Sequence, residues 1–224
     1  TLLLKAADIL ASKVAEFTTL MIEETGATGP WAGFNVMLAA NVLREAASMT
    51  TQITGEVIPS DKPGTLAMGI RQAAGVCLAI APWNAPVILA TRAIAMPIAC
   101  GNTVILKASE QCPGTHSLIG AALVEAGLPA GVINVITNAP EDAGDIVAAL
   151  IAHPAVRRVN FTGSTKVGKI IAKLCGEHIK PALLELGGKA PLIVLDDADI
   201  DGAVNAAIFG AFMHQGQICI STER

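Results

Sequence analysis

The fold class rests on residues 158–175, which read RVNFTGSTKVGKIIAKLC. The apolar positions Val159 and Phe161 predict a short strand, and a helix is expected to begin near Thr165. Glycine at a strand-to-helix turn lets the backbone approach a ligand, and the helix N-terminus offers free N–H groups and a positive dipole end. The stretch therefore predicts a turn that can bind a phosphate group.

The same turn also fits part of a P-loop, because Gly163 to Lys169 match its first seven positions, GxxxxGK. Position eight is Ile170, whereas a P-loop needs Ser or Thr there to bind magnesium. No GxGxxG dinucleotide fingerprint occurs in the chain. An ATPase is therefore disfavoured, and a glycine turn that only packs a helix against a sheet remains the alternative to a phosphate site.

Outward from this stretch, short apolar runs alternate with longer stretches at helical spacing from residue 75 onward. Strands are expected near residues 75–80, 103–107, 132–136, 157–161 and 191–195. Helices are expected near residues 86–99, 115–126, 142–152, 165–175 and 199–213. The alternation predicts an α/β fold with a doubly wound parallel sheet that binds ligands at the carboxyl ends of its strands.

The residues before this region predict two opening helices, at 2–24 and 35–49. Pro59, Pro63 and Gly64 then interrupt the pattern, so residues 55–70 are expected to form an extended arm or hairpin that could serve assembly. The helical pattern already under way at Thr1 indicates that the natural chain begins earlier.

Composition narrows the class of protein. Hydrophobic residues make up 52% and charged residues 15%, which suits parallel strands covered on both faces. The net charge of −4 and the lack of basic clusters argue against a nucleic-acid partner. Pro82 and Pro86 interrupt the longest uncharged stretch, so no membrane span is expected. The five cysteines are scattered, without metal-ligand spacing, which indicates no metal site and a reducing, cytoplasmic setting.

Lys107 ends the strand expected at 103–107 and Glu110 follows it, where loops reach a ligand. A glutamate beside a ribose accepts hydrogen bonds from free hydroxyls and repels a 2′-phosphate, which favours NAD over NADP. Taken alone, the two residues fit a solvated loop better than a ligand site.

Cys219 is the candidate nucleophile, because it follows Gly216 in a segment of small and polar residues just beyond a helix. Thiols are strong nucleophiles, and nearby dipoles increase their thiolate fraction. A Cys/His dyad with His214 is one alternative. Glu185, which ends the apolar strand Ala182–Glu185 before two glycines, is a better partner as a base.

Asn84 follows the strand expected at 75–80, so its side-chain amide could donate to an oxyanion. A plain turn residue is the alternative.

Five motifs then occur together: PWN at 82–84, LKASE at 106–110, FTGSTKVG at 161–168, LELGGK at 184–189 and GQIC at 216–219. In identity, order and spacing they resemble the aldehyde dehydrogenase superfamily, most of all its salicylaldehyde and vanillin branch. The resemblance implies that Cys219 attacks an aldehyde, that Asn84 holds the oxyanion, and that Glu185 activates the water that releases an acid.

The resemblance also implies NAD as cofactor. Lys107 and Glu110 would bind the adenine-side ribose, Gly163 and Ser164 the pyrophosphate, and Trp83 would line the cofactor site. The matched motifs add Ser109, Gly168 and Gly187 to the cofactor residues. The loop 138–144 departs from the pattern, because it lacks the paired glycines that many members carry.

The same resemblance divides the chain into a cofactor domain at 1–209 and the start of a catalytic domain at 210–224, with the rest of that domain beyond Arg224. It implies a homo-oligomeric parent. Two alternatives stay open: a nucleotide-binding module without catalysis, and a semialdehyde or acylating dehydrogenase that passes the acyl group to an acceptor other than water.

Overall fold

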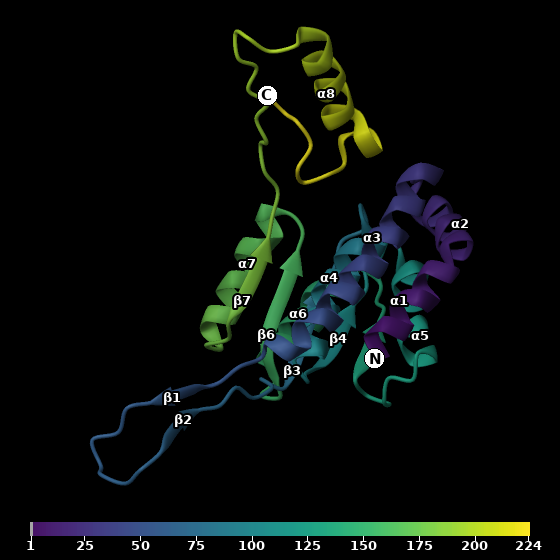
Figure 1. The fold of residues 1–224 in the computed structure, drawn as a ribbon. Helices are drawn as coiled ribbons and strands as arrows, with labels where there is room; N and C mark the ends of the chain where they lie inside the picture. Colours follow the sequence, from purple (N-terminus) through teal and green to yellow (C-terminus); the bar gives the residue numbers. More distant parts are fainter. Residues whose placement is uncertain (1) are drawn as a thin grey trace.

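The computed structural model describes residues 2–224, so the expectation about Thr1 lies outside the described residues. In this range the main sheet is parallel, with the strand order β5-β4-β3-β6-β7 (Figure 1). Its strands are β3 (Val76–Ile80), β4 (Thr103–Lys107), β5 (Ile133–Ile136), β6 (Val156–Thr162) and β7 (Ala182–Glu185). The predicted α/β class with a parallel, doubly wound sheet is confirmed.

Helices cover both faces of the sheet. They are α4 (Pro86–Ala99), α5 (Pro113–Glu125), α6 (Ala143–Ala152), which the short η2 (Pro140–Asp142) precedes, and α7 (Thr165–Glu177). In β3, Cys77 and Ala79 belong to the core formed with α1, α3, α4 and α5, whereas Leu78 and Ile80 belong to a second core with α6 and α7. This alternation is the period of two that a strand buried on both faces requires.

The chain changes direction across the sheet at β3. From β3 it moves to β4 on one side and later returns to β6 on the other. Ile80, at the carboxyl end of β3, is paired with Lys107 of β4 and with Phe161 of β6. Ligands of doubly wound folds bind in the crevice at such a switch point.

The N-terminal helices pack over α4 and α5. They are α1 (Leu2–Ser12), α2 (Val14–Thr25) and α3 (Gly29–Ser48), followed by η1 (Met49–Gln52). The single helix expected at 2–24 is therefore wrong, because the helix breaks at Lys13, where φ is −93° and ψ is 17°. Neither proline nor glycine marks this break in the sequence. The apolar stripe continues across it, since Leu10 and Phe17 are both fully buried.

The predicted arm is an antiparallel hairpin of β1 (Glu56–Ile58) and β2 (Ala67–Gly69). Figure 1 shows it projecting away from the body of the molecule. Its apolar side chains are exposed, including Val57 at 70% and Leu66 at 72%.

The strand expected at 191–195 is wrong. The segment is extended, but among the described residues it joins no ladder of the main sheet, and Ile193 is 78% exposed. Strand geometry needs a hydrogen-bonding neighbour, and β7 already occupies the place beside β6. The Leu192 N–H donates instead to the Arg224 carbonyl at 2.6 Å.

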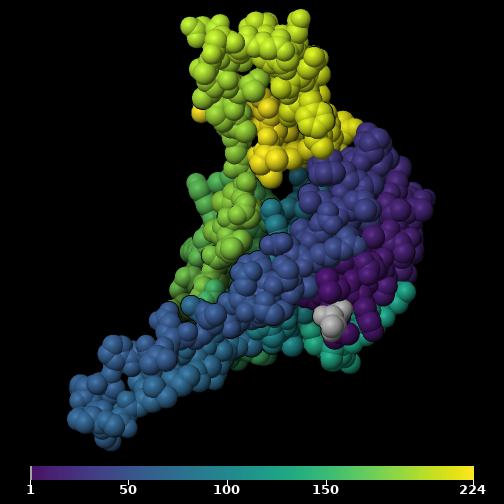
Figure 2. Space-filling view, viewed as in Figure 1, coloured from purple at the N-terminus to yellow at the C-terminus, as the bar shows by residue number. Residues whose placement is uncertain are grey.

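Residues from about 190 onward form a small lobe beyond β7, as Figure 2 shows in yellow-green and yellow. The lobe contains α8 (Ile200–Phe212) and η3 (Met213–Gly216). The predicted domain boundary at 209/210 falls inside α8 and stays a prediction. In the described part of the chain, no helix is both long and apolar enough to cross a bilayer.

Candidate active site

A cleft of about 350 Å³ lies between the end of the sheet and the small lobe. Trp83 and Asn84 reach it from the turn after β3, Glu185 from the end of β7, and Cys219 from the loop after η3. The turn between β6 and α7 and the residues after Glu185 complete the lining, with Gly163, Ser164 and Gly187. The three residues predicted to carry the chemistry therefore share one cleft, although 135 positions separate Asn84 from Cys219.

Asn84 is fixed from two sides. Its backbone carbonyl accepts a hydrogen bond from Trp31 Nε1 at 2.9 Å, and its Nδ2 donates to the Gln217 carbonyl at 2.7 Å. The second contact ties the β3 turn to the loop that carries Cys219. A side-chain amide has two hydrogens on nitrogen, so one remains available for a ligand oxygen.

The loop before Cys219 has an unusual backbone. His214 and Gln215 have φ values of 48° and 54°, and Gly216 continues the run at 74°. Left-handed backbone is costly for residues with a side chain and persists only where surrounding contacts hold it. The Cys219 thiol itself is exposed.

His214 supplies one of those contacts. Its side chain is only 4% exposed and stacks on Trp31, with ring centroids 5.2 Å apart. Trp83 lies 6.4 Å away at a tilted angle. Burial lowers the pKa of His214, so the ring is neutral near pH 7. Within residues 2–224 neither ring nitrogen has a hydrogen-bond partner, which leaves the Cys/His dyad without a contact.

Glu185 stands at the strand end that its sequence context predicts. Its backbone carbonyl accepts a hydrogen bond from Gly163 N at 3.0 Å, which joins the phosphate turn to the end of β7. The residue is exposed, so water reaches its carboxylate.

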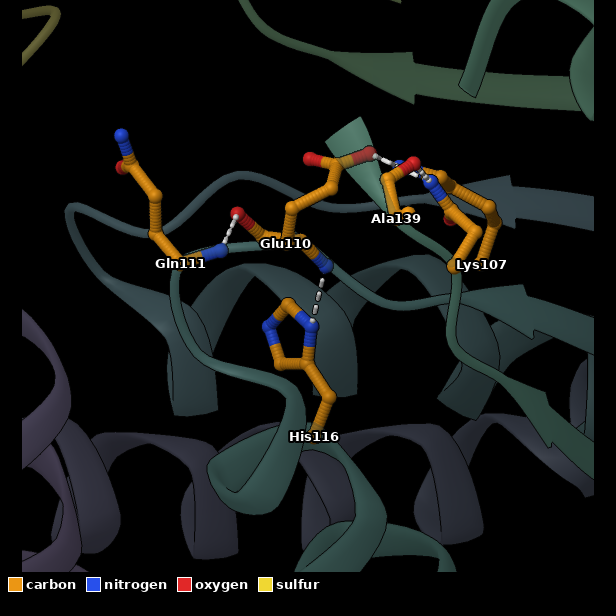
Figure 3. Close-up of polar contacts among 7 residues, drawn as sticks. Lys107, Glu110, Gln111, His116 and Ala139 are labelled. Carbon is orange, nitrogen blue, oxygen red and sulfur yellow. Dashed lines mark hydrogen bonds and ion pairs between the residues drawn. The ribbon is translucent and has the colours of Figure 1, made fainter. Parts of the chain in front are cut away.

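Lys107, Ser109 and Glu110 do not line this cleft but lie at the carboxyl end of β4, where Figure 3 shows Lys107 and Glu110. The Lys107 ammonium is buried and paired with Glu110, whose carboxylate also accepts from Asn138 Nδ2 at 3.1 Å. Burial alone would raise the pKa of Glu110, but the hydrogen bonds and the charge of Lys107 outweigh it and lower the pKa. Glu110 is therefore a carboxylate near pH 7.

At the predicted phosphate turn, Ser164 is the N-cap of α7 and its hydroxyl accepts from Val167 N at 3.3 Å. Gly163 has no room for a side chain, because a Cβ there would lie 2.5 Å from the ring of Phe161. Gly168 is not in the cleft. It is buried in α7 against Leu186, so the structure gives it a packing role.

Trp31 and Arg92 were not foreseen as site residues, and His214 was considered only as a base for Cys219. Trp31 and His214 hold the nucleophile loop through the stack described above, a contact that no local pattern reveals. Arg92 lines the cleft from α4. Its signal in the sequence is that it is the lone charge in the apolar helix PVILATRAIAMPIA. In the part of the chain that the structure describes, no cluster of histidine, cysteine or carboxylate side chains could hold a metal.

Comparisons with known proteins agree with these motifs. The chain is 68% identical over 222 residues to a vanillin dehydrogenase of Pseudomonas fluorescens, with 99% of this chain and 46% of that protein covered. Among solved structures, a salicylaldehyde dehydrogenase from Pseudomonas putida G7 complexed with salicylaldehyde matches with a TM-score of 0.95 and 57% identity, covering 99% of this chain and 46% of that one.

An NAD-dependent benzaldehyde dehydrogenase from Corynebacterium glutamicum matches with a TM-score of 0.90 and 38% identity, covering 99% of this chain and 48% of that one. The chain thus spans about half the length of the relatives it matches. The model of the aldehyde dehydrogenase family matches residues 1–224. The chain therefore belongs to the aldehyde dehydrogenase family.

Proposed function

We propose that the protein containing this chain oxidises an aromatic aldehyde to its carboxylic acid with NAD as oxidant. The observation that carries the proposal is the single cleft that unites Cys219, Glu185 and Asn84. The relatives described above support the substrate class, because their names specify vanillin, salicylaldehyde and benzaldehyde.

NAD fits the residues at the switch point. Ile80 of β3 pairs with Lys107 on one side and Phe161 on the other, so the β4 and β6 ends lie two strand spacings apart, about 10 Å. A dinucleotide can span that gap, with its adenine-side ribose at Lys107 and Glu110 and its pyrophosphate at Gly163 and Ser164. When bound, NAD accepts the hydride that leaves the substrate carbon.

Cys219 begins the reaction. Its thiolate adds to the aldehyde carbon and forms a thiohemiacetal, while negative charge develops on the former carbonyl oxygen. The free N–H of Asn84 and the Cys219 backbone N–H are the donors for that oxyanion. Loss of such a donor costs about 3 to 4 kcal/mol of transition-state stabilisation. Asn84→Ala should therefore lower kcat by roughly two to three orders of magnitude.

Glu185 completes the reaction. Loss of the hydride leaves a thioester on Cys219, and water must attack it to release the acid. Glu185 accepts the proton of that water, and the thiolate of Cys219 leaves. The exposed position of Glu185 in the same cleft supports this role.

The test is NADH formation from NAD and salicylaldehyde by the full-length protein. Cys219→Ala should abolish it, whereas Cys100→Ala, a change at another exposed cysteine, should not. Glu185→Gln should release about one NADH per site in a rapid burst and then stall, because the thioester is formed but not hydrolysed. Full activity of Cys219→Ala would refute the proposal, and steady turnover by Glu185→Gln would refute the role of Glu185.

We also propose that the full-length protein is a homo-oligomer. The projecting β1–β2 hairpin exposes apolar side chains on both strands, and an isolated two-stranded hairpin is marginal without further packing. A monomeric mass in sedimentation would contradict this proposal.

A further inference from the structure

His116 lies beneath the loop that carries Lys107 and Glu110 (Figure 3). It belongs to the first turns of α5 and has no exposed surface. Its Nδ1 accepts a hydrogen bond from the Ser109 backbone N–H at 3.0 Å. One imidazole thus supports the loop at a residue between Lys107 and Glu110, the pair that the proposed function assigns to the cofactor ribose.

The protonation state of His116 suits this task. Burial lowers its pKa to about 4, and the charge of Lys107 acts in the same direction. The ring is therefore neutral near pH 7. Because Nδ1 accepts from Ser109, the proton must be on Nε2, which lies 3.9 Å from Cys112 Sγ. The buried site therefore fixes one tautomer, the one that can accept from Ser109.

The helix that carries His116 is itself held in place. Glu24 of α2 accepts hydrogen bonds from the N–H groups of Gly114 and Thr115 at 2.7 and 2.9 Å, and from the Thr115 hydroxyl at 2.6 Å. These bonds satisfy free donors at the N-terminus of α5. His116 therefore supports the loop from a fixed base.

The loop has a second internal bond, since Gln111 N donates to Ser109 Oγ at 3.3 Å. Ser109 is thus one point at which the loop is held, from below by His116 and from within by its own hydroxyl. Lys107 and Glu110 contact each other directly, and the backbone between them determines where the pair lies. A shift of Ser109 would move the pair.

We propose that His116 is a positioning residue for the cofactor: by accepting the Ser109 N–H, it holds the pair of Lys107 and Glu110 at the place that two neighbouring ribose hydroxyls require. The inference rests on the proposed function, because it takes this loop as the ribose site. Its consequence is specific. Loss of the acceptor weakens binding of the adenosine end and leaves the chemistry at Cys219 intact.

The test measures binding of ADP-ribose to the full-length protein by calorimetry, without turnover. His116→Phe fills the site but removes the acceptor, and should raise the Kd about tenfold, the effect of losing one well-placed hydrogen bond. His116→Asn places an amide oxygen where Nδ1 lies and should bind nearly as the wild type does. The control is His153→Phe, because His153 Nδ1 also accepts a backbone N–H, from Ala155 at 3.2 Å, in an exposed position just after α6.

Two kinetic readouts separate positioning from a loss of structure. In His116→Phe the KM for NAD should rise while kcat at saturating NAD stays within about twofold of wild type. The preference for NAD over NADP should also fall, because a displaced Glu110 no longer faces the 2′ position. A protein that was only destabilised would keep that preference.

Wild-type affinity of folded His116→Phe for ADP-ribose would overturn the inference. If His116→Phe does not fold, the His116→Gln variant tests the inference in its place. Its amide reaches the position of Nε2 and not that of Nδ1, the atom that accepts the Ser109 N–H. Equal binding by the Asn and Gln variants would also overturn it. Failure of the wild type to bind ADP-ribose would instead refute the proposed cofactor, and the inference with it.

Discussion

Gly168 offers a sharp test of how α7 packs. A Cβ at this position would lie 2.5 Å from Leu186 Cδ2 and 3.2 Å from Cδ1, both closer than carbon atoms normally approach. Gly176 lies in the same helix, and a Cβ there would meet nothing within 4 Å. The same change, glycine to alanine, can therefore be made once in a tight place and once in an open one.

The two substitutions should differ in their effect on stability. Alanine favours a helix over glycine by up to about 1 kcal/mol, so Gly176→Ala should raise the free energy of unfolding by at most that amount. At Gly168 the same gain is opposed by overpacking, which costs about 1 to 3 kcal/mol. Gly168→Ala should therefore be less stable than Gly176→Ala by about 1 to 3 kcal/mol, a difference of several degrees in Tm.

The assay is thermal unfolding of the two full-length variants, together with Leu186→Ala and the double variant Gly168→Ala/Leu186→Ala. Because the cost arises from Leu186, removing its side chain should abolish most of the penalty, and the double-mutant cycle should show that coupling. Equal stabilisation by both alanines would refute the reasoning, since Leu186 would then move aside at no cost. Leu186 lines the cleft beside Glu185, so Gly168→Ala should also weaken NAD binding.

Three further predictions concern separate parts of the molecule. Glu24→Ala should lower the free energy of unfolding by about 2 kcal/mol, because it leaves the N-terminus of α5 without its carboxylate partner. Urea unfolding at pH 7 measures this change, and an unchanged free energy of unfolding would contradict the prediction. The pKa of His116 is about 6.5 in the unfolded chain and about 4 in the folded chain. Between these two pH values the unfolded chain therefore binds a proton at His116 that the folded chain does not bind. Stability should therefore fall as the pH drops between these values, by about 3 kcal/mol from His116 alone. His116→Asn should reduce the slope by that amount, although the lowered pKa of His214 leaves a slope of the same sign; identical slopes for the two proteins would contradict the assignment. In thiol labelling at neutral pH, Cys219 should react first and Cys112 only on unfolding, because Cys112 has no exposed surface and burial raises its pKa to about 12. Early modification of Cys112, detected by mass spectrometry, would contradict the assignment of Cys219 as the nucleophile.

Local patterns were sufficient for most elements. Each strand of the main sheet overlaps a stretch that the sequence predicts as a strand, and each helix that covers the sheet overlaps a stretch predicted as a helix, because both depend on hydrogen bonds with a short repeat. The failures have a physical reason too. The run at 191–195 has the composition of a strand but no neighbour to pair with, and the break at Lys13 has no local signal.

By itself the sequence determined the alternation of strands and helices, the glycine turn before α7, and the chemistry available at Cys219, Glu185 and Asn84. Only the tertiary structure decided that these three side chains share one cleft, that Gly168 packs on Leu186, and that His116 supports the loop of Lys107 and Glu110. Strand and helix periods arise from neighbours in the chain, whereas these contacts join residues of different elements. They exist only once the sheet and its helices have packed together.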